Sequence, residues 1–150
     1  MVHLRKDAKV SLLAKVPLFE RCTRRELSKI AAIAREAEYP ASTAVVREGG
    51  PGSELFIVLD GEVDVRRGGR KLATLRQGDF FGEIALITGS PRTATVTAGT
   101  KMHALVIGSR DFRRLLNDSP AIQNKLLQEV GERLERLSAG HPHQRIRLNV

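Results

Sequence analysis

Between residues 36 and 108 the chain alternates short β-type segments with turn signals, and this spacing limits the fold more than any other feature. Apolar and polar residues alternate with a period of two, which is typical of strands with one buried face. Gly49-Gly50-Pro51-Gly52, Asp60-Gly61, Gly68-Gly69 and Gly89-Ser90-Pro91 are turn sequences. Short antiparallel strands at this spacing predict a sandwich or barrel. The predicted segments are Ala44–Arg47, Leu55–Asp60, Glu62–Arg67, Lys71–Leu75, Ala94–Ala98 and Met102–Gly108.

Helical patterns lie on both sides of these segments. Thr23-x-x-Glu26 is a capping box, in which each residue bonds the other's backbone at the start of a helix. Ser119-Pro120 is a suitable start for a last helix, because proline is tolerated at the first helical position. The sequence therefore predicts one domain, 1–138, and a flexible basic tail, 139–150. Its predicted helices are 7–16, 24–35, 110–117 and 120–138, around a strand region at 36–108.

The stretch Phe80–Ala98 has the residues of an anion site. Gly82 precedes a short apolar segment, Glu83–Ile87, that can form one or two helical turns. The start of a helix presents N–H groups to an anion, and glycine lets a ligand approach the backbone closely. Arg92 follows the next turn and can return to the same place as a guanidinium fork. These features predict a pocket for a small phosphate.

Each of these residues also has an ordinary explanation. Arg92 taken alone is a surface arginine after a proline turn. Glu83 would favour a helix N-terminus simply through the helix dipole. Their combination at this spacing is what points to a ligand.

The same stretch resembles the phosphate-binding cassette of cyclic nucleotide-binding domains, as in bacterial catabolite-activator-type regulators and regulatory subunits of cAMP-dependent protein kinase. The resemblance extends over roughly Val16–Leu137. It implies a mainly β fold with flanking helices: an antiparallel β-roll (a double-stranded β-helix, jelly-roll-like) with N-terminal helices and a C-terminal lid helix. The matching residues are Phe81-Gly82-Glu83, Ala85-Leu86 and Pro91-Arg92-Thr93-Ala94, with Val96 and Ala98 behind them.

The resemblance also implies roles for individual residues. Arg92 would hold the cyclic phosphate and Glu83 would accept the ribose 2′-OH. A hydroxyl at Thr93 serves, in the family, either the phosphate or the amino group of guanine, so Thr93 leaves the base undecided. The ligand-binding residues expected in the cassette are Gly82, Glu83, Ile84, Ala85, Arg92, Thr93 and Ala94.

Further positions follow from the same resemblance. Val65, Leu72 and Ala73 align with strand positions around the nucleotide, although core packing explains them equally well. The last helix would cover the base as a lid and carry the output. Its expected lid residues are Leu134, Leu137 and Ser138, but a packing stripe or a homodimer contact explains the two leucines as well.

We therefore expect a regulatory module for a cyclic nucleotide, with cAMP first and cGMP second, that signals through its last helix. The alternative is a regulatory domain cut from, or acting in trans on, a larger effector such as a DNA-binding regulator, kinase, acetyltransferase or channel. Only about a dozen residues follow the last helix, too few for a helix-turn-helix, so no DNA-binding element is expected. The downstream protein partner stays open.

No enzyme is expected, because the sequence has no Walker loop, no zinc-type Cys/His spacing and no Gly-x-Ser-x-Gly elbow. No cofactor or metal is expected either. A single cysteine and the lack of a long apolar run favour the cytoplasm over a membrane. The net charge of +8 is spread in ones and twos, so we interpret most of it as solvated surface, with an acidic partner as the weaker alternative.

Overall fold

The structure is a computed structural model that describes residues 4–138, apart from the side chains of Ile84 and of 133–138. These residues divide into two compact units. One is β-rich and spans residues 34–109, and the other is helical and combines residues 4–33 with 110–138. Within 4–138, no helix has the length and apolar character needed to cross a lipid bilayer. The predicted tail, 139–150, lies outside the described residues.

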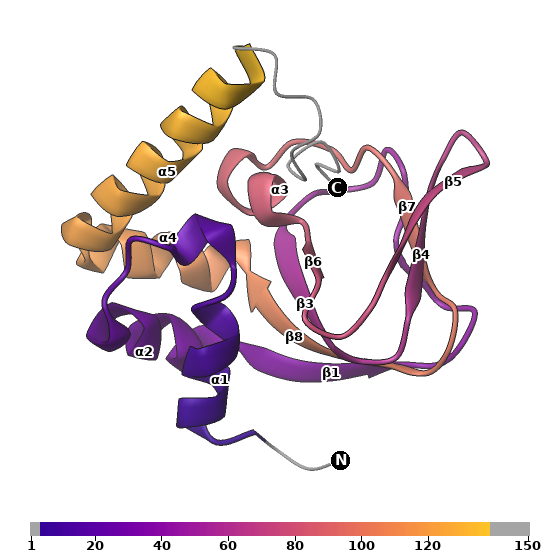
Figure 1. Cartoon of the computed structure of the whole chain (residues 1–150), viewed down its shortest axis with the longest axis horizontal. Coiled ribbons are helices and arrows are strands. Elements are labelled where there is room, and N and C mark those ends of the chain that lie inside the picture. Colours follow the sequence, from indigo (N-terminus) through magenta and orange to yellow (C-terminus); the bar gives the residue numbers. More distant parts are fainter. Residues whose placement is uncertain (1–3, 139–150) are drawn as a thin grey trace. The chain divides into compact units, whose positions relative to one another are not determined.

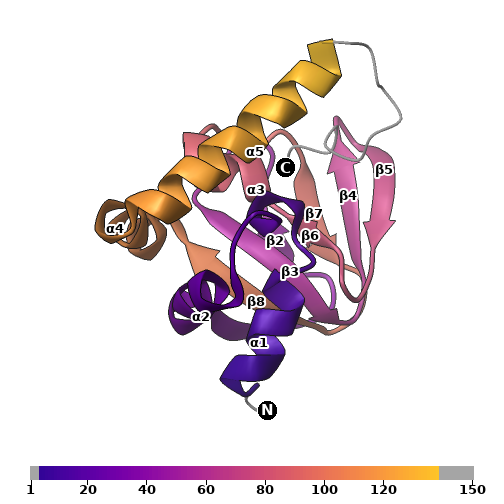
Figure 2. The ribbon, with the colours of Figure 1, turned by 60° about the vertical axis from the view of Figure 1, so that its left-hand side comes forward.

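The β-rich unit contains two four-stranded antiparallel sheets that form a β-roll (Figure 1). In the view turned by 60°, β4 and β5 of the second sheet stand apart from β3 and β8 of the first (Figure 2). The predicted fold class, mainly antiparallel β with flanking helices, is confirmed. The first sheet has the order β1 (Arg35–Tyr39), β8 (Met102–Gly108), β3 (Glu54–Asp60), β6 (Phe80–Phe81), and the second has the order β2 (Ala44–Val46), β7 (Thr95–Ala98), β4 (Val63–Arg67), β5 (Arg70–Leu75).

Strands β3 and β8 lie at the centre of the first sheet and are buried on both faces. Four consecutive residues are buried in each strand, 55–58 and 104–107, in apolar runs that suit a pleated backbone. Phe56 of β3 stacks on Phe81 with ring centroids 4.7 Å apart, and Tyr39 meets it edge-on at 6.3 Å. Strand β7 instead alternates buried and partly exposed residues, as expected when one face is covered.

The six predicted strand segments match observed strands to within one residue at either end, but two further strands were missed. Strand β6 has only two residues, too few to show an alternation. Strand β1 pairs with β8, with Arg35 opposite Val106. Because β1 takes Arg35, the helix predicted over 24–35 ends earlier, at Ile33.

The helical unit has a small aromatic and aliphatic core. Phe19 and Phe112 pack with ring centroids 6.2 Å apart, and Ile122 and Leu126 are buried. The first helix was predicted to reach residue 16 but ends at Leu13. Val16 is extended instead (φ −80°, ψ 119°), since a residue before proline avoids the helical region. The elements are α1 (Lys6–Leu13), the 3₁₀ turn η1 (Pro17–Phe19), α2 (Arg24–Ile33), α4 (Ser109–Asp118) and α5 (Pro120–Ser138).

The predicted capping box is present at the start of α2. The Thr23 amide donates to Glu26 Oε1 at 2.8 Å, and the Glu26 amide donates to Thr23 Oγ1 at 3.2 Å. Lys125 Nζ lies 2.5 Å from the same carboxylate oxygen. Lys125 and the Thr23 amide hold the pKa of Glu26 below its ordinary value. Glu26 therefore stabilises the helical unit above its unfolded-state pKa, and this contribution is lost as the pH falls through the folded-state pKa.

Replacing Thr23 by Ala removes the hydroxyl of this box. We expect the free energy of unfolding to fall by about 1 kcal/mol, the usual cost of losing an N-cap threonine. Urea denaturation at neutral pH measures the change. Thr23→Ser, which keeps the hydroxyl, is the control and should stay close to the wild type. An Ala variant as stable as the Ser variant would show that the box contributes nothing.

Candidate functional site

A short helix, α3 (Glu83–Thr88), lies between β6 and β7 and has a glycine at each end. Gly82 (φ +90°) and Gly89 (φ +68°) both adopt the left-handed conformation that glycine tolerates best. Ala85 and Leu86 are buried, and α3 packs on β3. Glu83, the first residue of α3, is only 5% exposed. The sharp backbone turns at the two glycines thus set where the helix begins and ends.

Arg92 is fixed by its backbone and by its side chain. Its amide donates to Gly50 O at 2.9 Å, and its carbonyl accepts from the Gly49 amide at 2.7 Å. Its guanidinium donates through Nε to Pro51 O at 3.3 Å and through Nη2 to Glu54 O at 2.9 Å. The residue is 3% exposed. The fork of Arg92 is therefore held in one orientation by carbonyls of a glycine-rich loop and of β3.

The guanidinium of Arg92 lies against the start of α3. A Cβ placed on Gly82 would be 2.7 Å from Arg92 Nη1 and 2.2 Å from Glu54 O. The Arg92 guanidinium also lies over the Phe56 ring, with its central carbon 5.8 Å from the ring centroid. At this distance a cation and an aromatic face attract. The structure thus brings together Gly82, Glu83 and Arg92, as the predicted anion pocket requires.

Burial lowers the pKa of Arg92 from its ordinary value, and the Glu54 carboxylate partly opposes this effect. Arginine still stays protonated at any physiological pH. Glu54 is also engaged elsewhere, because its Oε2 pairs with Arg35 Nη2 at 2.9 Å. A cation that has lost hydration attracts an anion more strongly than one in water. This site therefore has the charge needed for a monoanionic phosphodiester.

Thr93 and Ala94 continue from Arg92 toward β7. Thr93 is exposed and receives two hydrogen bonds from Arg67, at the end of β4. Nε of Arg67 donates to Thr93 O at 2.8 Å, and Nη2 donates to Thr93 Oγ1 at 3.2 Å. Ala94 is fully buried, so its side chain serves the core.

The three strand positions predicted to surround the nucleotide, Val65, Leu72 and Ala73, lie on β4 and β5. Val65 is fully buried and pairs with Ala73, on β5, and with Val96, on β7. Leu72 lies at a register shift between β4 and β5 and is 39% exposed. Val65 therefore belongs to the core, whereas Leu72 presents apolar surface at a sheet edge.

Four predicted residues have side chains outside the described set. Ile84 belongs to α3, and Leu134, Leu137 and Ser138 belong to the last turns of α5, so only their backbones are placed. Their contacts with a ligand stay a prediction.

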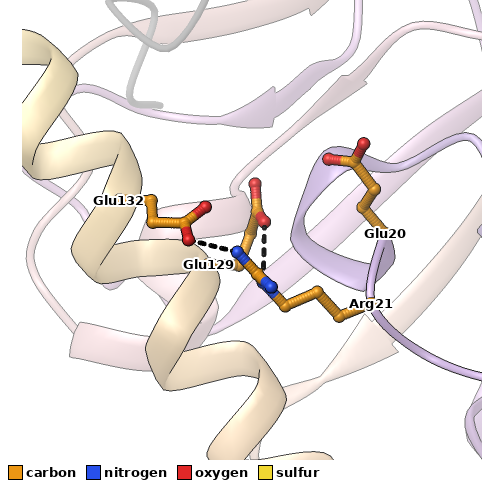
Figure 3. A pocket seen from close by; sticks show the side chains of 4 residues that line it. All are labelled: Glu20, Arg21, Glu129 and Glu132. Carbon is orange, nitrogen blue, oxygen red and sulfur yellow. Dashed lines mark ion pairs between the residues drawn. The ribbon is translucent and has the colours of Figure 1, made fainter.

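A separate hollow of about 340 Å³ lies in the helical unit, lined by Glu20, Arg21, Glu129 and Glu132 (Figure 3). Arg21 pairs with Glu132 and, at 3.5 Å, with Glu129. The hydrogen bond with Glu132 raises the pKa of Arg21. Three carboxylates around one guanidinium leave the hollow negatively charged, so it is unsuited to an anionic ligand. Within the described residues, no group of three or more His, Cys, Asp or Glu is placed to hold a metal ion.

Sequence reasoning missed the residues that support the cassette. The loop before β3 was interpreted only as a turn, and the carbonyls of Pro51 and Glu54 have no sequence signature. Arg67 was counted among the solvated charges. Its position at the end of a predicted strand, next to the Gly68-Gly69 turn, was the one available signal.

Comparison with protein families finds a match to the cyclic nucleotide-binding domain over residues 36–119. A cAMP-dependent protein kinase regulatory subunit of Yarrowia lipolytica is 38% identical over 116 residues, which are 76% of this chain and 31% of the relative. A cyclic nucleotide-gated potassium channel of Mesorhizobium japonicum is 40% identical over 111 residues, 74% of this chain and 31% of the relative. The chain thus spans about a third of the length of these relatives.

Two solved structures are also similar. The N-terminal domain of a transcriptional regulator from Streptomyces coelicolor is 30% identical with a TM-score of 0.78, covering 86% of this chain and 96% of that one. The regulatory domain of Toxoplasma gondii protein kinase A, crystallised with cAMP, is 26% identical with a TM-score of 0.67, covering 85% of this chain and 50% of that one.

The contact between Gly82 and β3 predicts a steep cost for any side chain at this position. In Gly82→Ala the new Cβ would overlap Glu54 O and displace Arg92, in addition to the strain of about 1–3 kcal/mol that a positive φ imposes. Gly78→Ala is the matched control, since Gly78 has the same φ of +90° and no atom within 4 Å of a Cβ. We expect Gly82→Ala to lose clearly more stability than Gly78→Ala in urea denaturation. Equal losses would contradict the packing described here.

Proposed function

Because the chain belongs to the cyclic nucleotide-binding domain family, we propose that it is a non-catalytic sensor whose ligand is cAMP, with cGMP as the second candidate. The buried Arg92 guanidinium against the start of α3 is the observation that carries this proposal. The similar kinase subunit is named for its dependence on cAMP, and the similar regulatory domain was crystallised with it. Both support cAMP as the first ligand to test.

In the proposed complex, the Arg92 guanidinium supplies the positive charge that binds the cyclic phosphate, and the amides of Gly82, Ile84 and Ala85 contribute at the start of α3. The Glu83 carboxylate accepts the ribose 2′-OH. Its negative charge beside a phosphate is tolerable only because Arg92 and the helix amides offset the repulsion. The remaining wall of the pocket would be formed by Thr93, Leu72 and Ala73, with the backbone of Ala94 and Val65 behind them, because the side chains of these two residues are fully buried.

A regulatory rather than catalytic role agrees with the chemistry of the single cysteine. Burial, with a smaller effect of Glu26, raises the pKa of Cys22 to about 11. Its thiol is thus protonated at neutral pH, which does not favour a nucleophile. A cytoplasmic location is part of the same proposal.

The alternative is that this sensor works as the regulatory part of a larger effector, or acts on one in trans. Such effectors include a DNA-binding regulator, a kinase, an acetyltransferase or a channel. The match with this chain spans 31% of the kinase subunit and 31% of the channel. In both relatives the matching domain is thus one part of a longer protein, which favours this alternative. Either version uses the same ligand site.

We further propose that residues 1–138 act as one sensing domain and that α5 carries the output. Leu134, Leu137 and Ser138 would cover the base in the ligand-bound state. A ligand that touches both the pocket and the lid favours one arrangement of α5 and so shifts its population. A homodimer through α5 is one form that the output could take.

Isothermal titration with cAMP and with cGMP tests the ligand. We expect micromolar or tighter binding of at least one, equivalent to about 8 kcal/mol or more. Arg92→Ala should weaken it at least about tenfold, because a charge-assisted fork is lost. Arg76→Ala, which removes a positive charge from an exposed side chain of the same unit, is the control and should bind like the wild type.

Arg92 also supports Pro51 O and Glu54 O, so the folding of each variant has to be measured alongside binding. Circular dichroism and thermal unfolding identify a variant that binds poorly only because it is unfolded. Arg92→Lys keeps the charge without the fork and should bind between the wild type and Arg92→Ala. A folded wild type that binds neither nucleotide would refute the proposal.

Hydrogen exchange tests the output. Saturating cAMP should slow amide exchange in residues 82–94 and also change it in residues 120–138, because binding selects one arrangement of the lid. Arg92→Ala, compared with the wild type at a cAMP concentration near the wild-type Kd, is the control and should show much smaller changes, because weaker binding leaves most of its sites empty. Protection confined to residues 34–109 would leave the ligand site in place and refute the role of α5.

A further inference from the structure

Most of the net positive charge of the chain belongs to the helical unit. The β-rich unit, residues 34–109, contains nine Lys or Arg and nine Asp or Glu, so its charges cancel. Residues 4–33 and 110–138 contain 14 basic and eight acidic residues. Charges that are dispersed along the sequence are thus concentrated by the fold in one unit. A surface with an excess of one sign attracts a partner of the opposite sign.

Helix α4 carries three of these cations on one face. Arg113 and Arg114 follow Arg110 by three and four residues, the spacings that bring Cβ atoms on one side of a helix to about 5–6 Å. All three arginines are exposed. Phe112, on the opposite side of α4, is buried and packs on Phe19 with ring centroids 6.2 Å apart. The helix therefore joins the core through Phe112 and presents an α4 arginine face, Arg110, Arg113 and Arg114, to the solvent.

The position of these arginines is unfavourable for α4 itself. Within the described chain, no hydrogen bond or ion pair engages any of the three guanidiniums. Like charges three or four residues apart destabilise a helix, and cations near its N-terminus oppose the helix dipole. All three lie in the first six residues of α4, whose last turn has no basic residue. The arrangement weakens the helix in the isolated chain, and a negatively charged partner would offset this effect.

The chemistry of the α4 arginine face limits the class of partner. A guanidinium binds a carboxylate through two parallel hydrogen bonds, and arginine is enriched in protein interfaces. A helix that lies on a membrane needs an apolar side for the lipid, whereas the apolar side of α4 is occupied by its contact with Phe19. Single-stranded nucleic acid needs exposed aromatic rings for stacking, and the aromatic ring of α4 is buried. Three cations are also few for duplex DNA, where about six to ten phosphate contacts are common.

We propose that the α4 arginine face is a docking surface for an acidic segment of another protein, whose Asp or Glu side chains pair with the three guanidiniums. The face contains no residue of the candidate ligand site, so this inference goes beyond the proposed function and does not depend on it. Exposed ion pairs are weak one by one, but docking removes water from around them and strengthens them. Helix α4 ends at Asp118 and α5 begins at Pro120, so the partner would bind directly ahead of the helix proposed to carry the output (Figure 2).

Fluorescence anisotropy with a labelled decaglutamate peptide tests this inference on the chain without nucleotide. An α4 triple variant, which combines Arg110→Gln, Arg113→Gln and Arg114→Gln, should bind the peptide about tenfold more weakly at low salt, as for three lost exposed ion pairs. A labelled decaglutamine peptide should bind neither protein. Added NaCl should weaken the binding of decaglutamate to the wild type more steeply than to the variant, because the variant forms fewer ion pairs.

A second triple variant removes the same charge from the β-rich unit. Arg47, Arg66 and Arg70 are exposed, so their combined replacement by Gln is the matched control. This control should bind decaglutamate within about twofold of the wild type, since its charges lie outside the proposed surface. Equal losses in the two triple variants would show that net charge alone attracts the peptide, and would overturn the inference.

Two further measurements separate docking from a role in folding. Decaglutamate should shift the backbone amide resonances of residues 109–118 more than those of residues 63–75, and the opposite result would overturn the inference. In urea denaturation, the α4 triple variant should be at least as stable as the wild type, because repulsion between like charges is removed. A clear loss of stability would show that the arginines serve the fold and would also overturn the inference.

Other partners, and failure of the proposed function, give different results. Vesicles containing phosphatidylserine and a short DNA duplex are compared with decaglutamate at physiological salt. Tighter binding of either one through the same three arginines would show that an acidic protein segment is the wrong occupant. A wild type that binds decaglutamate through α4 but neither cyclic nucleotide refutes only the proposed function. A wild type that binds a nucleotide, while the α4 triple variant binds decaglutamate as well as the control does, refutes only this inference.

Discussion

Two backbone carbonyls, those of Pro51 and Glu54, hold the guanidinium of Arg92 in a buried position. A buried charge is costly unless its hydrogen-bonding groups find partners, so the form of the cassette depends on the loop and the strand that supply these carbonyls. Gly82 is required by the same arrangement, since a Cβ there would touch both Glu54 O and Arg92 Nη1. The shape of the candidate site thus follows from the contacts that keep the buried Arg92 guanidinium bonded to the protein.

Local features of the sequence predicted the fold and the centre of the site. Alternation located six strands, because a strand with one covered face has a period of two regardless of its partner. The capping box at Thr23 was predictable because both of its hydrogen bonds lie within four residues. Gly82 and Gly89 mark the two ends of α3, because both adopt a left-handed backbone conformation. The placement of Arg92 near Gly82 followed from the cassette, whose parts are close together in the chain.

Long-range partners were not predictable in the same way. The carbonyls that bind Arg92 lie 41 and 38 positions away, and a carbonyl carries no information about residue type. Arg67 contacts Thr93 from 26 positions away and looks like any surface arginine in the sequence. Strand β1 was missed because it is short and none of its residues is buried, so only its pairing with β8 identifies it. Each of these contacts depends on which distant segments lie side by side in the fold, and local propensity does not show that.

The β4–β5 hairpin has one more property, which concerns the open edge of its sheet. Strand β5 is the last strand of the second sheet in the described chain, so one side of its backbone has no neighbouring strand. Across the turn, Arg66 faces Lys71 and Arg67 faces Arg70. Like charges in opposite positions weaken a hairpin, yet cations on an edge strand discourage another chain from adding to it. These cations therefore weaken the hairpin slightly, but they discourage the β5 edge of one molecule from pairing with a strand of another.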